Sequence, residues 1–525
     1  MASVPLRAGI EPAPTAMAGG RVSIPLLAFA ALAAVYLFFF VRVLTWNPDG
    51  GIYIYGAQMV LRGAIPARDF VELQGPGSFY WLAMFFKFFG VSFLTARAVL
   101  LVTGTATATL LFYLGQRIGG TGISAALVVL VTSIPLGVMT SPHYDSNLFA
   151  LAAFAIFVHG AEGIHRRWSF LTAGALAGAT SCFLQQKGFY LACAFVLTLF
   201  ILHRARARGA AMLVGLGFSG VIAAELLLYT WAHALRYLVY ANLIWPLSTY
   251  EKANSAPYGF ILREGFWRSW YPALHAIFPG PVALGLVFIF SVPFLLILGL
   301  PAILPLLAYR WRTDASERRL IPYWAAGIAI WASELHRWDL GHLRNGCVLL
   351  LVVSFALLER RKRAVGKYVA AGITGCAVLY GTVNVAAASG QRVPIQSRRG
   401  TLYGSTTDPV LEFLQTHTTR GEEVFVYPYQ PIYYFAADVR NPTRYSNLMY
   451  GINTDAQFHE AVEDIERKRV RYVLWDTVFS GEGLRNLFPA YRPPAKDKLI
   501  MEPYLERNYR QIGFENGFRI LERKR

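Results

Sequence analysis

The chain has few charged residues for its length. Only 15% of its 525 residues are Asp, Glu, Lys or Arg, whereas soluble proteins average about 25%. Hydrophobic residues make up 55% of the sequence, and the mean hydropathy is +0.40. This composition excludes an ordinary soluble protein and indicates a chain that crosses a membrane several times.

Cysteine and histidine are also scarce. All four cysteines lie in apolar runs, so we interpret them as small buried hydrophobic residues without disulfide partners. The ten histidines are scattered, and no spacing in the sequence is typical of a zinc site or a phosphate-binding glycine loop. We therefore expect no certain cofactor; a divalent cation held weakly by carboxylates stays open.

Basic residues outnumber acidic ones by 49 to 31, which gives a net charge of +18. In a soluble domain this excess would suggest a nucleic-acid partner, but here the bases sit between apolar runs, so we expect none. Many fall in connections predicted to lie on one side of a membrane, which is typical of cytoplasmic loops. They are Arg117, Arg166, Arg167, Arg204, Arg206, Arg208, Arg310, Arg312, Arg318, Arg319, Arg360, Arg361, Lys362, Arg363 and Lys367.

Apolar runs organise residues 21–390 into a predicted transmembrane domain. The first run, 22–44, is long enough to cross a bilayer and too long for a cleaved signal, so it predicts an uncleaved anchor after a disordered cytoplasmic tail at 1–20. About eleven membrane helices are predicted in all, which places the C-terminus outside the cytoplasm. The other runs are at about 91–115, 121–140, 146–162, 169–184, 188–203, 210–232, 282–308, 320–335, 345–358 and 367–388.

Beyond residue 390 the composition becomes that of a soluble domain. The segments EVFVY at 423–427 and VRYVLW at 470–475 are typical of strands, and 406–416 and 455–469 are typical of helices. Their alternation predicts a small extracytoplasmic α/β domain over 391–525. The predicted fold class is therefore a polytopic α-helical membrane protein with a small C-terminal α/β domain.

The titratable residues outside the cytoplasmic connections gather on the opposite side of the predicted membrane. This arrangement predicts a single active face. Its segments are a first extracytoplasmic loop at 45–90, turns at 141–145, 185–187 and 333–344, and a long loop at 233–281.

Asp49 is the first candidate on that face. It follows the anchor between Asn47-Pro48 and Gly50-Gly51, so a turn would present it before a helix that starts at Ile52. A general base for a reacting hydroxyl and an ordinary helix N-cap are both open interpretations.

Further acidic candidates follow in the same loop and in the next turn. For Asp69 and Glu72 we favour a local ion pair beside Arg68 over a second polar contact. Asp145, in a turn with His143, either faces the active side or caps the next helix. Glu225 lies inside an apolar run, where it is either functional or bonded to a neighbouring helix.

Arginine and lysine are normally enriched in the cytoplasmic loops of membrane proteins. Those predicted to lie on the opposite, active face are therefore unusual, which favours a functional role for them. Arg337 and Arg344 could clamp a phosphate, with His342 or Asp339 orienting them, and Lys187 gains from the same reasoning. The alternative is a solvated turn with snorkelling arginines.

A set of motifs recurs along the first loop and in the turn at 333–344. They are Asp49, Tyr53 or Tyr55 with Ala57 and Gly63, Arg68-Asp69-Phe70, Gly75-Pro76, Phe88-Phe89-Gly90 with Arg97, and Arg337-x-Asp339-x-x-His342. With these motifs the chain resembles the GT-C superfamily of integral-membrane glycosyltransferases, in the bacterial branch related to protein O-mannosyltransferases and the lipid A aminoarabinose transferase. The resemblance is strongest over about 45–100, and the many-helix layout extends it to roughly 390 residues.

The resemblance implies an inverting transferase that moves a sugar from a polyprenyl-phosphate carrier to an envelope lipid, glycan or protein at the outer face of the cytoplasmic membrane. Asp49 aligns with the catalytic first-loop acid of the superfamily. Many relatives have a second acid directly after it, but here that position is Gly50, so a paired role would pass to Asp69, Glu72 or Asp145.

The remaining assignments concern the donor. Lys187, Arg337, Arg344 and His342 would bind the donor phosphate, and the long loop with Tyr250, Arg263 and Arg268 would cover it. Two other classes stay open: a transporter or flippase for a lipid-linked sugar, with polar sites near the bilayer midplane, and a noncatalytic envelope scaffold in which Asp49 is dispensable.

Overall fold

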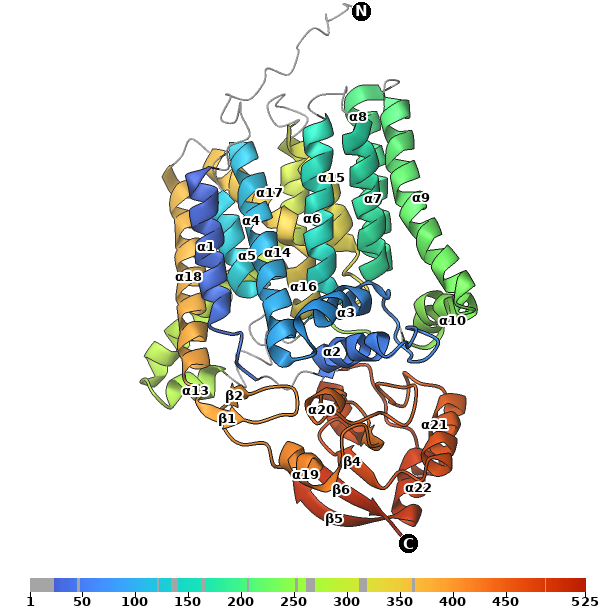
Figure 1. Cartoon of the computed structure of the whole chain (residues 1–525). Coiled ribbons are helices and arrows are strands. Elements are labelled where there is room, and N and C mark those ends of the chain that lie inside the picture. Colours follow the sequence, from blue (N-terminus) through green and yellow to red (C-terminus); the bar gives the residue numbers. More distant parts are fainter. Residues whose placement is uncertain are drawn as a thin grey trace, which may run out of the picture.

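The computed structural model describes residues 23–44, 48–119, 122–133, 140–161, 167–204, 207–250, 254–260, 270–310, 319–360, 364–486 and 488–525. Within these ranges the chain forms a bundle of long helices with a smaller domain at one end, and that domain contains the strands (Figure 1). The predicted fold class is confirmed.

Each apolar run predicted to cross the membrane coincides with a helix. These helices are α1 (Ile24–Phe38), α4 (Phe93–Gly119), α5 (Gly122–Thr132), α6 (Pro142–Ala161), α7 (Arg167–Phe183), α8 (Gln185–His203), α9 (Ala207–Trp231), α14 (Gly280–Arg310), α15 (Ile321–Ala332), α17 (Val348–Arg360) and α18 (Ala364–Ser389). Among the described residues, five helices are long and apolar enough to span a membrane, or six if the short α16 (Leu340–Gly346) and α17 form one span bent by 66°. The chain is thus a multi-pass membrane protein, and the count of eleven crossings stays a prediction.

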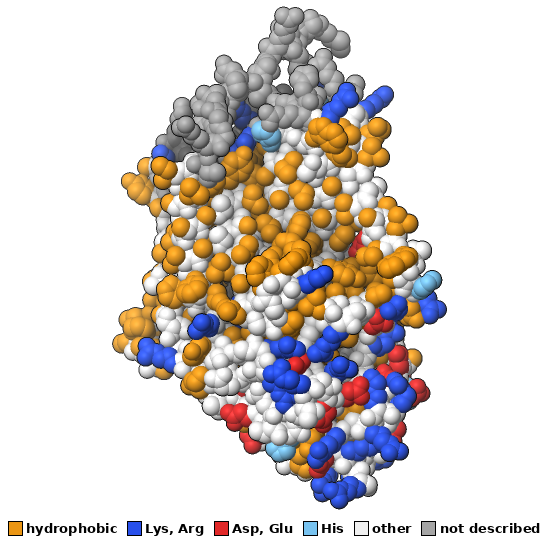
Figure 2. Space-filling view, in the orientation of Figure 1, with side chains coloured by type: hydrophobic (Ala, Val, Ile, Leu, Met, Phe, Trp, Pro, Cys, Tyr) orange, Lys and Arg blue, Asp and Glu red, His pale blue; other side chains and the backbone are white. Residues whose placement is uncertain are grey.

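Burial follows the hydrophobic pattern of each helix. Helix α17 is apolar on all sides, and residues 348–353 are almost fully buried in the middle of the bundle. Helix α9 instead exposes Leu227 and Trp231 at its outer face. Figure 2 shows hydrophobic side chains covering the flank of the bundle, whereas charged side chains concentrate on the small domain. An apolar flank of this extent is suited to lipid.

Two short helices lie between the bundle and the small domain, α2 (Pro48–Leu61) and α3 (Gly77–Phe89) (Figure 1). Helix α2 begins at Pro48, earlier than the predicted start at Ile52. Proline is well suited to the first turn because that turn needs no backbone donor. Asp49 therefore lies within the first turn of a helix, and the prediction of a separate turn before the helix is wrong.

The long loop at 233–281 is itself largely helical where it is described. It contains α10 (Leu235–Val239), the π-helical segments η2 (Tyr240–Ile244) and η3 (Pro246–Tyr250), and α13 (Tyr271–His275). Arg263 and Arg268 lie outside the described residues, as do the predicted tail at 1–20 and the bases Arg166, Arg206, Arg312, Arg318, Arg361, Lys362 and Arg363.

The C-terminal domain is built on a mixed four-stranded sheet of order β3-β4-β6-β5. Strand β3 (Val424–Tyr427) runs parallel to β4 (Tyr472–Asp476), with Val424 opposite Tyr472, and β6 (Phe518–Arg523) pairs antiparallel with β4 and with β5 (Tyr509–Glu515). Both segments predicted as strands are strands. The other elements are β1 (Val393–Ile395), β2 (Leu402–Gly404), α19 (Pro409–His417), α20 (Ile432–Ala436), α21 (Asp455–Arg467), η6 (Gly481–Asn486), η7 (Lys496–Lys498) and α22 (Met501–Asn508).

The C-terminal domain shares a core with the interfacial helices. The ring of Tyr55 in α2 packs on Tyr434 of α20 at 5.0 Å. Beside it, Asp438 accepts hydrogen bonds from Gln58 of α2 at 3.1 Å and from Arg62, the residue after α2, at 3.0 Å. Apolar packing, together with these polar contacts to the buried Asp438, docks the domain on α2.

The predicted gathering of polar segments on one face agrees with this arrangement. Helices α2, α3, α10 and α16 all lie at the end of the bundle that meets the C-terminal domain (Figure 1). The opposite ends of α4 and α8 carry Arg117 and Arg204, which belong to the predicted cytoplasmic belt.

Candidate active site

Asp49 is held from across the domain boundary. Its side chain is exposed, and Tyr429, which lies between β3 and α20, donates its hydroxyl hydrogen to Oδ1 of Asp49. Among the described residues, no other side chain donates to this carboxylate or forms an ion pair with it. Its second oxygen is thus available to a substrate hydroxyl.

Glu72 lies close enough to Asp49 for the two charges to interact. It is 3% exposed, and the Ser446 hydroxyl of the C-terminal domain hydrogen-bonds to it. Burial is the main cause that raises the pKa of Glu72; the hydrogen bond from Ser446 lowers it and the charge of Asp49 raises it, and the net result is a pKa of about 8. Glu72 is therefore protonated near pH 7, and the local ion pair favoured from the sequence is wrong for this residue.

Asp69 makes the local contacts expected of it. Its carboxylate lies 2.9 Å from Nε of Arg68 and accepts the Ile65 backbone N–H at 2.7 Å. The local ion pair with Arg68 is confirmed, and it leaves this carboxylate occupied within its own turn.

Asp145 joins two helices. It is 2% exposed in the first turn of α6 and accepts hydrogen bonds from Ser78 of α3 at 2.7 Å and from Thr140 at 3.1 Å. Both bonds are made by neutral hydroxyls, and the bond from Ser78 ties α6 to α3.

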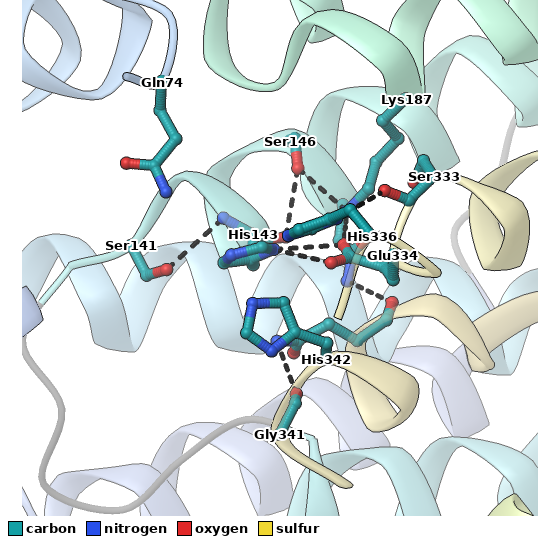
Figure 3. Close-up of polar contacts among 12 residues, drawn as sticks. Gln74, Ser141, His143, Ser146, Lys187, Ser333, Glu334, His336, Gly341 and His342 are labelled. Atoms are coloured by element: carbon teal, nitrogen blue, oxygen red, sulfur yellow. Dashed lines mark hydrogen bonds and ion pairs between the residues drawn. The ribbon is translucent and has the colours of Figure 1, made fainter. Parts of the chain in front are cut away.

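Glu334, in the turn after α15, is the centre of a buried polar cluster (Figure 3). His143 approaches with Nδ1 2.9 Å from Oε2, and Nζ of Lys187 lies 2.8 Å from Oε1. Burial alone would raise the pKa of Glu334, but His143 and Lys187 hold it well below its usual range. The sequence predicted this turn as part of the active face, but we did not select Glu334 as a candidate site residue. Its position within an apolar run, where a carboxylate is unusual, could have indicated a function.

Lys187 has its ammonium group fully engaged. Besides Glu334, it donates to Ser146 Oγ at 3.0 Å and to Asn147 Oδ1 at 2.9 Å, both on α6. Three acceptors match the three N–H groups of an ammonium. The geometry therefore suits Lys187 to holding Glu334 and α6 in place.

Three histidine rings surround this cluster. His342 lies 5.0 Å from His143 and 4.9 Å from His336, measured between ring centroids. Within the described ranges, no group of three or more His, Cys, Asp or Glu side chains is arranged to hold a metal ion.

Asp339 orients both of its predicted partners. It caps α16 by accepting the backbone N–H of His342 at 2.9 Å, and the same oxygen lies 2.9 Å from Nδ1 of that ring. Its other oxygen accepts from Nε of Arg337, whose Nη1 donates to Asn254 at 2.7 Å. The Arg337 guanidinium also lies 5.0 Å from the ring centroid of Phe488 in the C-terminal domain. Arg337 is thus fixed on several sides.

Arg344 differs from the other bases of this face. Lys187 and Arg337 pair with carboxylates, whereas no described carboxylate pairs with Arg344. Its Nη1 donates weakly to the Thr132 carbonyl at 3.3 Å, and its buried Nε has no hydrogen-bond partner. Tyr144 lies within electrostatic range of both Arg344 and Asp49. Arg344 is therefore a guanidinium without a carboxylate partner among the described residues.

A pocket of about 490 Å³ opens beside Arg337. Its walls come from the segment before α13 and the turn after α15, and the exposed rings of Tyr258 and Trp338 form part of them. The lining residues are Ser255, Ala256, Pro257, Tyr258, Leu335, His336 and Trp338.

Two solved structures with this architecture are distant from the chain in sequence. No protein-family model and no curated sequence matches the chain. ArnT from Cupriavidus metallidurans, bound to undecaprenyl phosphate, is 11% identical with a TM-score of 0.53 over 94% of this chain and 97% of that one. An oligosaccharyltransferase from Archaeoglobus fulgidus, solved with zinc and sulfate, is 15% identical with a TM-score of 0.52 over 92% of this chain and 71% of that one.

Both of these structures are GT-C glycosyltransferases, so this chain has the GT-C fold. The resemblance inferred from the first loop is confirmed at the level of the fold. At such low identities the likeness does not assign a substrate.

Proposed function

We propose that the chain is an inverting glycosyltransferase that takes a sugar from a polyprenyl-phosphate carrier and transfers it to an acceptor of the cell envelope, a lipid, glycan or protein. The reaction would take place at the outer face of the cytoplasmic membrane. The shared fold supports glycosyl transfer, and the ArnT structure contains undecaprenyl phosphate. The observation that carries the proposal is the exposed Asp49 carboxylate, with one oxygen open, on the same face as the uncompensated Arg344.

In the proposed step, Asp49 accepts the proton of the acceptor hydroxyl as that oxygen attacks the anomeric carbon. The new bond joins the acceptor oxygen to this carbon, and the bond to the phosphate oxygen breaks on the opposite face, which inverts the configuration. The bonding electrons leave with the polyprenyl phosphate. General-base assistance of this kind typically increases the reaction rate by about 10²–10⁴-fold.

Arg344 is the proposed partner of the departing phosphate, because no carboxylate in the described part of the chain pairs with it. Arg337 would contribute a second contact from a guanidinium fixed by Asp339 and Asn254. Preorganised positive charge stabilises a developing anion without reorganisation in the transition state.

Lys187, His143 and His342 are assigned supporting roles in this proposal. Lys187 and His143 keep Glu334 charged inside the protein, and His342 completes the cap on α16 with Asp339. They position the segment that bears both arginines. The neutral form of Glu72 lets it lie beside Asp49 without repelling it.

The test is sugar transfer from radiolabelled polyprenyl-phosphate sugars in membranes that contain wild type, Asp49→Asn or Asp69→Asn at equal expression. Asp69→Asn is the matched control, because it alters a carboxylate of the same loop that is occupied by Arg68. We expect Asp49→Asn to abolish transfer with unchanged thermal unfolding, and Asp69→Asn to retain it.

Equal transfer by wild type and Asp49→Asn would show that Asp49 is not the base. If no sugar is transferred by wild type from any donor of the pool, purified protein in liposomes is tested for movement of the lipid-linked sugar between leaflets. Movement without transfer would establish a transporter instead, and neither activity would favour a scaffold.

A further inference from the structure

Tyr429 brings the C-terminal domain into direct contact with the proposed base. It is separated from Asp49 by 380 positions in the chain, yet its hydroxyl donates to the Asp49 carboxylate. Tyr429 is buried, and it follows β3 by two residues in the segment that leads to α20. The contact therefore exists only when the C-terminal domain is docked.

The backbone around this contact is closely fitted. Gly51, two residues after Asp49, packs against the start of α20, where a Cβ atom would lie 2.5 Å from the Ile432 nitrogen. This approach fixes the distance between the first turn of α2 and the segment that carries Tyr429. A side chain larger than hydrogen at position 51 would force the two apart.

The same domain reaches the phosphate side of the site. Phe488 packs on the Arg337 guanidinium at 5.0 Å, and the Ser446 hydroxyl bonds to Glu72. The C-terminal domain thus contacts groups on both sides of the space where the substrates would meet.

We propose that Tyr429 is a positioning residue for the Asp49 carboxylate, so that the C-terminal domain completes the active site of the enzyme proposed above. By occupying Oδ1, its hydroxyl leaves Oδ2 facing the acceptor hydroxyl. A donor to a carboxylate also favours the ionised form, which is the form that acts as a base. This inference rests on the proposed function of Asp49.

The groups that face Asp49 are consistent with this role. They are Tyr53 on the same helix, Glu72 before α3, Tyr144 at the start of α6, Tyr250 in η3, and Tyr429. Among the described residues, only Tyr429 donates a hydrogen bond to Asp49. Burial, followed by the negative charge of Asp49, raises the pKa of Tyr429 well above its usual range. Tyr429 therefore remains a donor throughout the physiological pH range.

The decisive comparison is the pH profile of transfer by wild type, Tyr429→Phe and Tyr434→Phe. Tyr434 lies in α20 of the same domain, where its hydroxyl accepts the Val426 N–H at 2.8 Å, so its loss controls for general effects on the domain. Loss of a hydrogen bond to a charged group that acts in the reaction lowers the rate by a factor of roughly 10–100. We expect Tyr429→Phe to lower kcat by that factor and to move the acid limb of the pH–rate profile to higher pH. The KM for the lipid donor should stay within about twofold of the wild-type value.

Tyr434→Phe should keep the wild-type pH profile even though it leaves the buried Val426 N–H unpaired and lowers thermal stability, whereas Tyr429→Phe should keep the wild-type thermal unfolding. A Tyr429→Phe profile that superimposes on wild type would overturn the inference. So would a uniform loss at every pH together with a raised KM, because that pattern indicates a general structural defect.

A second measurement separates failure of this inference from failure of the proposed function. Carbodiimide modification of Asp49, followed by mass spectrometry across a pH series, needs no sugar transfer, and the exposed side chain is accessible to the reagent. Since carbodiimide attacks the protonated carboxyl, modification of Tyr429→Phe should persist to higher pH than that of wild type.

If modification shifts but wild type transfers no sugar, the contact stands and the proposed function fails. If transfer depends on Asp49 but neither profile shifts in Tyr429→Phe, the inference fails while the proposed function stands.

Discussion

Lys187 and Glu334 form an ion pair of 2.8 Å in which neither side chain has any exposed surface. The pair joins α8 to the turn that carries Arg337 and Asp339. Removing two charges from water costs several kcal/mol per ion, which only good geometry and further hydrogen bonds offset. His143, Ser146 and Asn147 provide those bonds, so the cluster holds the proposed donor side of the site in one arrangement.

Loss of one partner of this pair should strongly destabilise the fold. We expect Lys187→Met to lower the free energy of unfolding by about 3–5 kcal/mol, because it leaves the fully buried Glu334 without its lysine partner. The double variant Lys187→Met/Glu334→Leu should recover most of that loss. Denaturant unfolding in detergent measures both changes.

Lys468→Met is the control, since Lys468 pairs with Glu423 at the partly exposed surface at 3.2 Å. Its cost should stay below about 1 kcal/mol. A loss no larger for Lys187→Met than for Lys468→Met would contradict the structural role assigned to the buried pair.

Arg344 should matter more for transfer than for stability. Removing one preorganised donor to a developing anion typically costs about 10²–10³ in kcat. We expect a loss of that size for Arg344→Ala and a smaller one for Arg344→Lys, which keeps the charge but not the planar fork. Steady-state transfer assays and binding of polyprenyl phosphate to purified protein provide the measurements.

Arg236→Ala is the matched variant for Arg344. Arg236 lies exposed in α10 at the same end of the bundle but contacts the partly buried ring of Tyr237. Its transfer rate should equal that of wild type. Unaltered phosphate binding and rate in Arg344→Ala would remove Arg344 from the proposed mechanism.

Glu72 should give the protein a pH-dependent stability. Its pKa in the folded state, about 8, lies above the ordinary value of 4.5, so the folded state binds more protons between these pH values. The stabilising contribution is fully present below about pH 4.5 and is lost as the pH rises toward 8. Relative to Glu72→Gln, wild type should lose at most about 1.4 kcal/mol per pH unit across this range.

Unfolding of wild type and Glu72→Gln at pH 5 to 8, in steps of one unit, is the corresponding measurement. Glu412→Gln changes an exposed glutamate of α19, and its free energy of unfolding should depend on pH in the same way as that of wild type. Parallel curves for wild type and Glu72→Gln would show that Glu72 is ionised in the folded protein.

Gly51→Ala should disturb the docking of the C-terminal domain. The new Cβ would lie 2.5 Å from the nitrogen and 2.9 Å from the Cα of Ile432, and backbone atoms cannot rotate away. Overpacking of this kind costs about 1–3 kcal/mol. We expect lower thermal stability, faster proteolysis between α18 and α19, and reduced transfer.

Gly220→Ala offers the comparison, because the position is helical in α9 and nothing lies within 4 Å of the added atom. Alanine there should be neutral or stabilise the helix by up to about 1 kcal/mol. If Gly51→Ala and Gly220→Ala show the same thermal stability, proteolysis and transfer, the close contact between α2 and α20 is not required for docking of the C-terminal domain.

The candidate site was partly predictable. Asp49 and Arg344 were named because a charge beside a membrane-length apolar run is unusual wherever it occurs. Glu334 was missed although it lies at the end of a predicted apolar run, because the sequence does not show whether a carboxylate at that position is buried. Glu72 was misjudged because its sequence neighbour Arg68 pairs with Asp69 instead. The partner chosen by each charge depends on distances that the sequence does not contain.

The sequence by itself determined the membrane helices and the strands β3 and β4. Hydropathy over a helix length and alternation over a strand are local properties, and they are decided by whether a segment faces lipid, protein or water. Only the tertiary structure decided which charges remain free. Asp49 meets Tyr429 and Arg337 meets Phe488 because the C-terminal domain docks on α2, a contact between segments hundreds of residues apart. That docking depends on the shape of both surfaces at once, including the space left by Gly51.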